Sequence, residues 1–376
     1  MHPSPYDLLI RAGRVFCAVN HLDGPGSVAV RGDRIVAAGP DAAGPALRAL
    51  DFPDGLLLPG LVDLHAHPAR GGSKYGIDPD LHYLPRGVTT VLSQGDAGAA
   101  DWPAYRSAVI EAARARVRLA INLSVMGESN PRYCFEGLAD ADVDACVKAI
   151  EEDAGRAIWG ISVNISRAAC GDTDARELLR RALEVARRTG RPLWFGSRLT
   201  PDWPIEEQLA LLRPGDVLTY CFTGAEENIL RLGHVKAGVW EARRRGILFD
   251  VGHGMSSFSF PVAEAAIAQG FWPDTISTDQ YVRHVGLLPQ HDLPRTLSKL
   301  IAAGLPEAEA LARVTARPAQ VLGLASEIGA LTPGGCADLA VLRWNAGAAP
   351  LRDVDGVERP GGCWEPALSV RAGSIV

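Results

Sequence analysis

The sequence predicts an α/β protein in which a (β/α)8 TIM-type barrel carries a small β-sandwich domain. Residues 58–329 alternate eight short apolar runs with helical segments, and eight strand–helix units over roughly 270 residues match such a barrel. Residues 1–57 and 330–376 instead read as short strands separated by turn residues. An open doubly wound sheet is the alternative for the middle of the chain, but no glycine-rich dinucleotide motif opens its first unit.

The two ends of the chain have the same strand-and-turn style. The first end contains DLLIRAGRVF and SVAVRGDRIVAAG, in which Arg31, Gly32 and Asp33 lie between two apolar runs like a hairpin turn. The second end contains GALTPGGCADLAVLRW and PALSVRAGSIV. We therefore expect residues 1–57 and 330–376 to build one small β-domain, with the catalytic barrel over residues 58–329.

The barrel strands are predicted from apolar runs of four to eight residues. In order they are LVDLHAH, TTVLSQG, LAINLSVMG, IWGISVNI, PLWFGS, DVLTYCF, ILFDVG and TISTD. A typical intervening helix is DTDARELLRRALEVARRTG, with Asp172 or Thr173 as the expected N-cap and Gly190 followed by Pro192 as the stop.

The composition excludes several classes of partner. The 376 residues carry 38 Lys and Arg against 44 Asp and Glu, a net charge of -6, without the dense basic run that a nucleic acid or an anionic membrane would need. The first residues lack a signal-peptide pattern, and no apolar run is long enough to span a membrane. The seven cysteines are dispersed and form no C-x-x-C pair, which favours reduced thiols. We expect a cytoplasmic protein with a small-molecule partner.

Polar residues at the C-terminal ends of the predicted strands are the candidate site. In PGLVDLHAH, the alternation of a strand points His65 and His67 to one face, where two imidazoles can hold one metal ion. Because the strand ends of a barrel share one mouth, side chains from other strands converge on the same place. The remaining candidates at strand ends are Asp96, Tyr220, His253 and Asp279.

These motifs together resemble the amidohydrolase superfamily, over nearly the whole chain. The similarity is carried by PGLVDLHAH, RGVTTVLSQGDAGA, DVGHG, ISTD and GALTPGGCADLAVL. The segment GGSKYGIDPD adds a narrower resemblance to dihydroorotase-like amidohydrolases and deacetylases related to the D-aminoacylases. The resemblance implies that His65, His67 and Asp279 hold one metal ion.

The same resemblance places the ligands of a second metal at three positions that are changed here. The family's strand-4 lysine aligns with Ser162, its strand-5 histidine with Gly196 and its strand-6 histidine with Tyr220. Glycine offers no side-chain ligand, a serine hydroxyl is a poor one, and tyrosine must first lose a proton of pKa about 10. We therefore expect at most one metal ion.

A one-metal site needs a further ligand. In D-aminoacylases a bridging cysteine follows strand 2, and the closest position in this chain is Asp96. Two imidazoles with the carboxylates of Asp96 and Asp279 would suit Zn2+ or another divalent ion. The resemblance further implies that Asp279 takes a proton from the attacking water and passes it to the leaving group. His253 is a candidate acid or base, and Tyr220 a candidate donor to the substrate carbonyl.

The substrate contacts have also changed. Asn164 stands where related deacetylases have an arginine for the substrate carboxylate, so an acyl-amino-acid carboxylate would lose a bidentate partner. Ser162 and Asn164 are expected to face the substrate. The cations able to compensate for this loss are expected in loops at the barrel mouth, and they are Arg70, Lys74, Arg198 and Arg283.

The sequence thus favours a divergent amidohydrolase that cleaves an amide, cyclic amide or ester bond of a small polar molecule with one metal ion. A metal-free lyase, isomerase or cyclase on the same barrel is the alternative, and a non-catalytic ligand-binding scaffold is a further one. Barrel enzymes of this kind are commonly oligomeric, so we expect a homo-oligomer.

Overall fold

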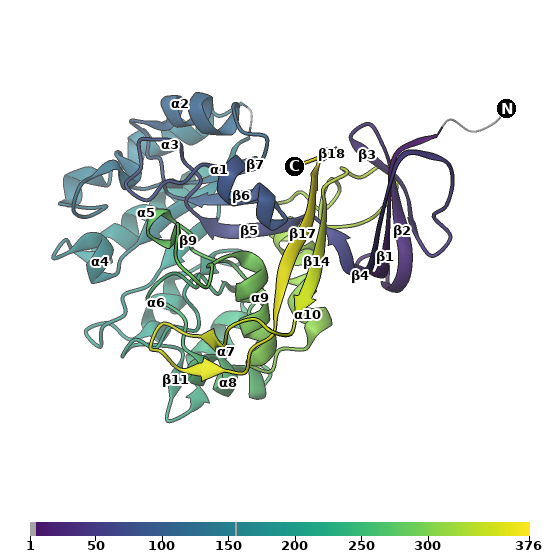
Figure 1. Ribbon diagram of the computed structural model, residues 1–376. Helices are drawn as coiled ribbons and strands as arrows, with labels where there is room; N and C mark the ends of the chain where they lie inside the picture. The colour runs from purple at the N-terminus through teal and green to yellow at the C-terminus, as the bar shows by residue number, and fades with distance from the viewer. Residues whose placement is uncertain (1–4, 155) are drawn as a thin grey trace.

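The structure is a computed structural model that describes residues 5–154 and 156–376 (Figure 1). Its larger part is built around a parallel sheet with the order β13-β10-β9-β8-β7-β6-β5. These strands are β5 (Leu61–Ala66), β6 (Val88–Gln94), β7 (Arg116–Asn122), β8 (Ile158–Asn164), β9 (Leu193–Gly196), β10 (Val217–Leu218) and β13 (Leu248–Phe249). They correspond to the first seven predicted strands.

The eighth predicted segment, TISTD, closes the sheet through single bridges. Thr275 pairs with Asp250 beyond β13, and Gln280 pairs with Ala66 at the end of β5. The backbone N–H of Asp279 donates to the carbonyl of His65 at 2.6 Å, which fastens the last strand to the first. The predicted α/β barrel is therefore confirmed, with its eighth strand reduced to bridges.

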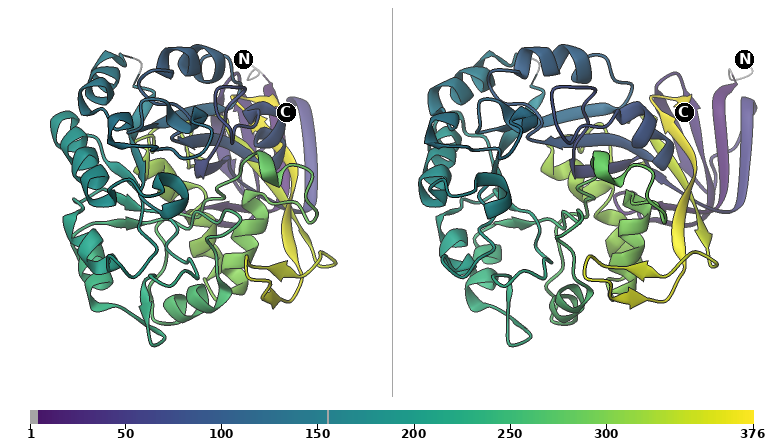
Figure 2. Two further views of the ribbon diagram at one scale, coloured as in Figure 1. Left: turned by 90° about the vertical axis from the view of Figure 1, so that its left-hand side faces the viewer. Right: turned by 60° about the vertical axis from the view of Figure 1, so that its left-hand side comes forward.

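Helices cover the outside of this sheet, and Figure 2 shows the units following one another around a ring from blue through teal to green. Every residue of β6 is buried, as is typical of a parallel strand packed on both faces. The helices are α1 (Pro79–His82), α2 (Trp102–Tyr105), α3 (Val143–Glu152), α4 (Arg167–Cys170), α5 (Ala175–Thr189), α6 (Ile205–Leu211), α7 (Ala237–Arg244), α8 (Phe260–Ala268), α9 (Leu293–Ala302), α10 (Glu307–Ala312) and α11 (Ala316–Val321). Short 3-10 or π turns are η1 (Leu84–Arg86), η2 (Arg106–Ile110), η3 (Gly127–Ser129), η4 (Leu138–Asp140) and η5 (Val282–His284).

Helix α5 begins slightly later than predicted. Its N-cap is Asp174, whose carboxylate accepts from the N–H groups of Arg176 and Glu177, so the expected caps Asp172 and Thr173 lie outside the helix. All three residues have cap-forming side chains, and only the observed one is placed to reach these N–H groups. The helix ends at Gly190, whose φ of 69° is the left-handed conformation that favours glycine.

The two ends of the chain form a second seven-stranded sheet with the order β18-β17-β14-β4-β1-β2-β3. Its strands are β1 (Tyr6–Cys17), β2 (Leu22–Arg31), β3 (Arg34–Gly39), β4 (Ala46–Pro59), β14 (Leu339–Asn345), β17 (Cys363–Arg371) and β18 (Ser374–Ile375). Neighbouring strands are antiparallel except β1 and β4. Two small hairpins complete the fold, β11 (Leu230–Arg231) with β12 (His234–Val235) and β15 (Leu351–Arg352) with β16 (Glu358–Arg359). The exact domain boundaries at residues 57/58 and 329/330 stay a prediction. Residues 1–4, which belong to the predicted small domain, lie outside the described ranges.

One strand connects the two sheets without a loop. β4 runs to Pro59 in the second sheet, and β5 starts at Leu61 in the barrel, so Gly60 alone separates them (Figure 1). A Cβ atom on Gly60 would lie 2.2 Å from Thr89 Oγ1, so a side chain is excluded at this junction. The strand that ends at the two histidines is therefore anchored directly in the second sheet.

Two further features concern the cysteines and the apolar character of the helices. All seven cysteines are buried and unpaired. Within residues 5–154 and 156–376, no helix combines the length and the apolar character needed to cross a membrane.

Candidate functional site

The structure brings His65, His67 and Asp279 together at the barrel mouth. Asp279 Oδ1 lies 3.4 Å from His65 Nε2 and 3.3 Å from His67 Nε2. All three ligand atoms lie within 4.8 Å of one another. Ligands at the usual 2.0–2.1 Å from a tetrahedral Zn2+ would be separated by about 3.3–3.4 Å. Two of the three separations match this value, so the residues fit one metal ion.

The backbone of Asp279 helps to aim its carboxylate. This residue has a φ of 48°, a left-handed conformation that aspartate tolerates better than most residues. A Cβ atom on Gly254 would lie 2.5 Å from Asp279 Oδ2, which is too close. The glycine therefore leaves room for the carboxylate. The sequence DVGHG thus contributes a space to the site rather than a ligand.

Hydrogen bonds behind the two histidines fix their tautomers. His65 Nδ1 lies 2.7 Å from Thr219 Oγ1, and that hydroxyl donates to Asp250 Oδ2 at 3.0 Å. The hydroxyl proton is used on Asp250, so His65 Nδ1 must donate to Thr219. On His67, Nδ1 donates to Asp96 Oδ1 at 3.0 Å. In the neutral imidazoles, these bonds leave the lone pair on each Nε2 atom, facing the space between the two rings, as metal-binding imidazoles require.

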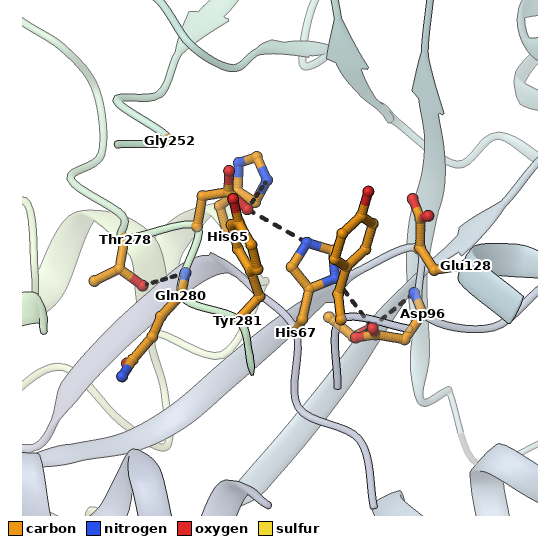
Figure 3. A network of polar contacts seen from close by, with 12 residues as sticks. His65, His67, Asp96, Glu128, Gly252, Thr278, Gln280 and Tyr281 are labelled. Carbon is orange, nitrogen blue, oxygen red and sulfur yellow. Dashed lines mark hydrogen bonds and ion pairs between the residues drawn. The ribbon is translucent and has the colours of Figure 1, made fainter. Parts of the chain in front are cut away.

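Asp96 is placed differently from the expected fourth ligand. Figure 3 shows His67 between His65 on one side and Asp96 on the other. Asp96 also accepts from the hydroxyls of Ser73 and Ser93, both at 2.6 Å, and it is absent from the described groups of converging ligand atoms. Its carboxylate thus orients His67. Burial opposes the charged form of His67, but Asp96 and Asp279 raise its pKa well above the usual value.

Tyr220 stands beside the ligand atoms. Its hydroxyl lies 3.4 Å from His65 Nε2, and its φ of 61° turns it into the site from the end of β10. Burial, reinforced by the charge of Asp279, raises the pKa of Tyr220 well above 10. The phenol is therefore neutral and can act as a hydrogen-bond donor.

A cavity of about 410 Å3 opens next to these groups. Its lining includes the predicted residues Ser162, Asn164, Tyr220 and Asp279, and Arg283 lies exposed at its rim. This volume is within the range of small-molecule sites. The cavity therefore adjoins the candidate metal ligands directly.

The space that a side chain at residue 196 would need is filled by a neighbouring side chain. A Cβ on Gly196 would lie 2.8 Å from Asn164 Cγ and 3.0 Å from Asn164 Oδ1. A histidine at this position would therefore collide with Asn164. Together with Ser162 and Tyr220, this substitution leaves no ligand set for a second ion among these positions.

Two predicted site residues have other partners. Arg70 binds Asp78 at 2.9 Å and Asp80 at 2.7 Å, at the start of α1, and it is absent from the described cavity lining. His253 donates from Nδ1 to the carbonyl of Gly254 at 2.7 Å, and its Nε2 lies 2.7 Å from Lys299 Nζ. Both nitrogens of His253 are thus occupied, and the structure places it behind the site rather than at the substrate.

Sequence reasoning missed several lining residues, above all Glu128 and Gln94. Glu128 Oε1 accepts from the Cys134 thiol at 2.8 Å, and its Oε2 lies 3.5 Å from Lys74 Nζ. Burial raises the pKa of the Glu128 carboxyl. Glu128 lies in a loop turn without a motif. Gln94, in contrast, ends a strand, and this position was a usable signal.

Comparisons with known proteins agree with the geometry. No family model matches the chain. It is 33% identical over 311 residues to Deacetylase Atu3266 of Agrobacterium fabrum, covering 80% of this chain and 74% of that protein. It is 32% identical to a deacetylase of Enterococcus faecalis, covering 94% of each. A crystal structure of an adenine deaminase superposes with a TM-score of 0.88 at 31% identity, covering 99% of both chains.

These similarities extend over the barrel and the second sheet alike, and they are similarities to enzymes. They give no support to the metal-free lyase, isomerase or cyclase, or to the non-catalytic scaffold. Sequence identity above 30% over most of the chain, together with the shared fold, assigns the ancestry. The chain belongs to the amidohydrolase superfamily of hydrolytic enzymes.

Proposed function

We propose that the protein is a deacylase that hydrolyses the C–N bond of an acylated small polar molecule with one divalent metal ion, most suitably Zn2+. His65, His67 and Asp279 would hold the ion. The observation that carries the proposal is the spacing of 3.3 and 3.4 Å between Asp279 Oδ1 and the two Nε2 atoms. The relatives named deacetylases support an amide or cyclic amide over an ester.

A bound divalent ion supplies a Lewis acid and lowers the pKa of water toward about 7. The protein's own groups handle protons and position the substrate. Asp279 would take a proton from the attacking water and return it to the leaving nitrogen, because its carboxylate faces both the histidines and the cavity. Tyr220, as a neutral phenol, would donate to the substrate oxygen as negative charge develops there.

The cavity residues would hold the rest of the substrate. Ser162 and Asn164 are two residues apart on strand β8 and both line the cavity, and Arg283 offers a cation at the rim. Asp96 would keep His67 in the ligating tautomer. Seven buried, unpaired cysteines support a reducing compartment such as the cytoplasm. A homo-oligomer is a family-level expectation that light scattering would test.

The experiment combines metal analysis with turnover. Protein purified with Zn2+ should hold about one ion per chain and release acetate from N-acetylated amines. Asp279→Asn should abolish release, and His67→Ala should abolish metal binding as well. Protein that binds no Zn2+, Mn2+ or Fe2+, or that retains full activity after Asp279→Asn, would exclude the proposal.

A further inference from the structure

The floor of the cavity is a layer of uncharged polar residues at the ends of three adjacent strands. Leu92 on β6 and Ala120 on β7 pack with Trp194 in one buried cluster of the barrel. Gln94 and Asn122 follow them by two residues, so strand alternation turns both to the same side, one layer nearer the mouth. Ser162 pairs with Asn122 across β7 and β8 and continues the layer.

Gln94 is a buried amide without a partner. Its side chain lines the cavity and the residue is only 5% exposed. Among the described residues, none accepts from or donates to the side-chain amide, and Oε1 is fully enclosed. A buried polar group in this state is destabilising unless a ligand satisfies it.

Ser162 and Asn164, which also line the cavity, each have one side-chain polar atom without a hydrogen-bond partner among the described residues. Within the described ranges, Ser162 Oγ and Asn164 Nδ2 have no hydrogen-bond partner, whereas Asn164 Oδ1 accepts from the N–H of Ser166. Asn122 differs, since its Nδ2 donates to Gly95 and its Oδ1 accepts from Ser124. The free groups of the floor are therefore one complete amide, one hydroxyl and one amide nitrogen.

Among the described residues, the floor offers no free cation for a carboxylate. Lys74, which lines the wall, donates to the carbonyl of Asn130 at 2.9 Å and lies 3.5 Å from Glu128. Arg167 and Arg283 also line the cavity but are exposed and belong to loops or short helices rather than to the strand-end layer. An anionic group placed on the floor would thus lose its hydration without gaining an ion pair.

We propose that this floor is a subsite for a neutral amide-type group of the substrate, a carboxamide, lactam or ureide, and that Gln94 determines this specificity. The inference rests on the proposed function, because it concerns the part of the substrate next to the scissile bond. An amide carries both an N–H donor and a C=O acceptor, so in either rotation of the Gln94 amide it can pair with the end that faces the cavity. A carboxylate lacks the N–H, so it could pair only with the nitrogen end of Gln94.

The test compares two probes that differ only in this group, N-acetylglycinamide and N-acetylglycine, with the Zn2+-loaded full chain. Acetate release reports deacetylation, and calorimetry reports binding independently of turnover. We expect kcat/KM to be at least about tenfold higher for the carboxamide. In Gln94→Leu this ratio should fall to near one through a higher KM for the carboxamide.

Controls separate folding from recognition. Gln94→Met keeps the approximate size of the side chain without its amide, and it should keep the melting temperature while weakening binding of the carboxamide through loss of the amide's hydrogen bonds. Gln320→Leu makes the same change as Gln94→Leu at an exposed helix position, and it should leave both probes unaffected.

The outcomes also separate this inference from the proposed function. Acetate release from both probes without preference for the carboxamide, or an unchanged ratio in Gln94→Leu, would overturn the inference and leave the deacylase. Tighter binding of the carboxamide without any acetate release would support the subsite and overturn the deacylase. Failure of the carboxamide to bind at millimolar concentration would also overturn the subsite.

Discussion

His67 donates from Nδ1 to Asp96 across 3.0 Å, while Nε2 of the same ring faces Asp279 at 3.3 Å. The carboxylate therefore lies behind a candidate metal ligand. We predict that Asp96→Ala weakens Zn2+ binding by about 10- to 100-fold, because His67 loses the partner that fixes its ring and tautomer. Titration against a competing chelator measures the affinity.

Asp172→Ala is the matched control, because it removes a fully exposed carboxylate and should leave the affinity unchanged. A loss for Asp96→Ala as complete as that for His67→Ala would instead identify Asp96 as a direct ligand. Unchanged affinity would remove it from the metal site altogether.

Tyr220→Phe should lower kcat by about 100-fold without changing the Zn2+ content. The hydroxyl 3.4 Å from His65 Nε2 is a neutral donor at the point where substrate oxygen would become negative, and loss of one such donor has an effect of this size. Stopped assays with elemental analysis of the same sample provide both numbers. Tyr133→Phe, outside the described cavity lining, should behave as the parent protein, and equal kcat values for the two variants would contradict the role of Tyr220.

Gly196→Ala should destabilise the fold by about 1–3 kcal/mol, because the new Cβ would lie 2.8 Å from Asn164 Cγ. Removing the obstacle in Gly196→Ala/Asn164→Ala should restore part of this loss, so the two changes should not add. Urea unfolding of the single and double variants measures the coupling. Strict additivity would mean that Asn164 does not occupy the space at Gly196.

The free energy of unfolding should increase as the pH rises from 7 to 9, because the buried Lys299 loses its proton more readily in the folded protein than in the unfolded chain. Burial, assisted by the charge of Arg295, lowers the pKa of Lys299 from 10.5 to about 7. Between pH 7 and 10 the unfolded chain binds a proton that the folded chain does not, so the free energy of unfolding increases with pH. The contribution over pH 7–9 is about 2 kcal/mol, and Lys299→Met should lack it. Urea unfolding at several pH values measures the free energy of unfolding of the parent protein and of Lys299→Met. An equal increase with pH in both proteins would refute this assignment.

The sequence was sufficient to predict that His65, His67 and Asp279 meet at the strand ends of the barrel. Alternation within one strand placed His65 and His67, and barrel closure placed Asp279 beside them, because both features follow from backbone geometry. The same alternation, applied to Leu92, would have identified Gln94 as a cavity residue. The apolar runs also predicted the positions of the barrel strands, although the eighth makes only single bridges.

Other assignments depended on side-chain partners that spacing does not encode. Nothing in the sequence tells on which nitrogen of His67 the carboxylate of Asp96 lies. Arg70 is held by Asp78 and Asp80 at the start of α1, and Nε2 of His253 is occupied by Lys299, 46 residues away. These contacts are settled by packing of loops and helices, so they had to be observed in three dimensions.

The single residue between β4 and β5 limits how this enzyme can move. A sheet joined to the barrel by continuous strand, with no space for a side chain at Gly60, cannot swing over the mouth like a lid. Substrate entry and product release must then depend on the loops around the mouth, and the second sheet provides a rigid support for the strand that carries both histidines.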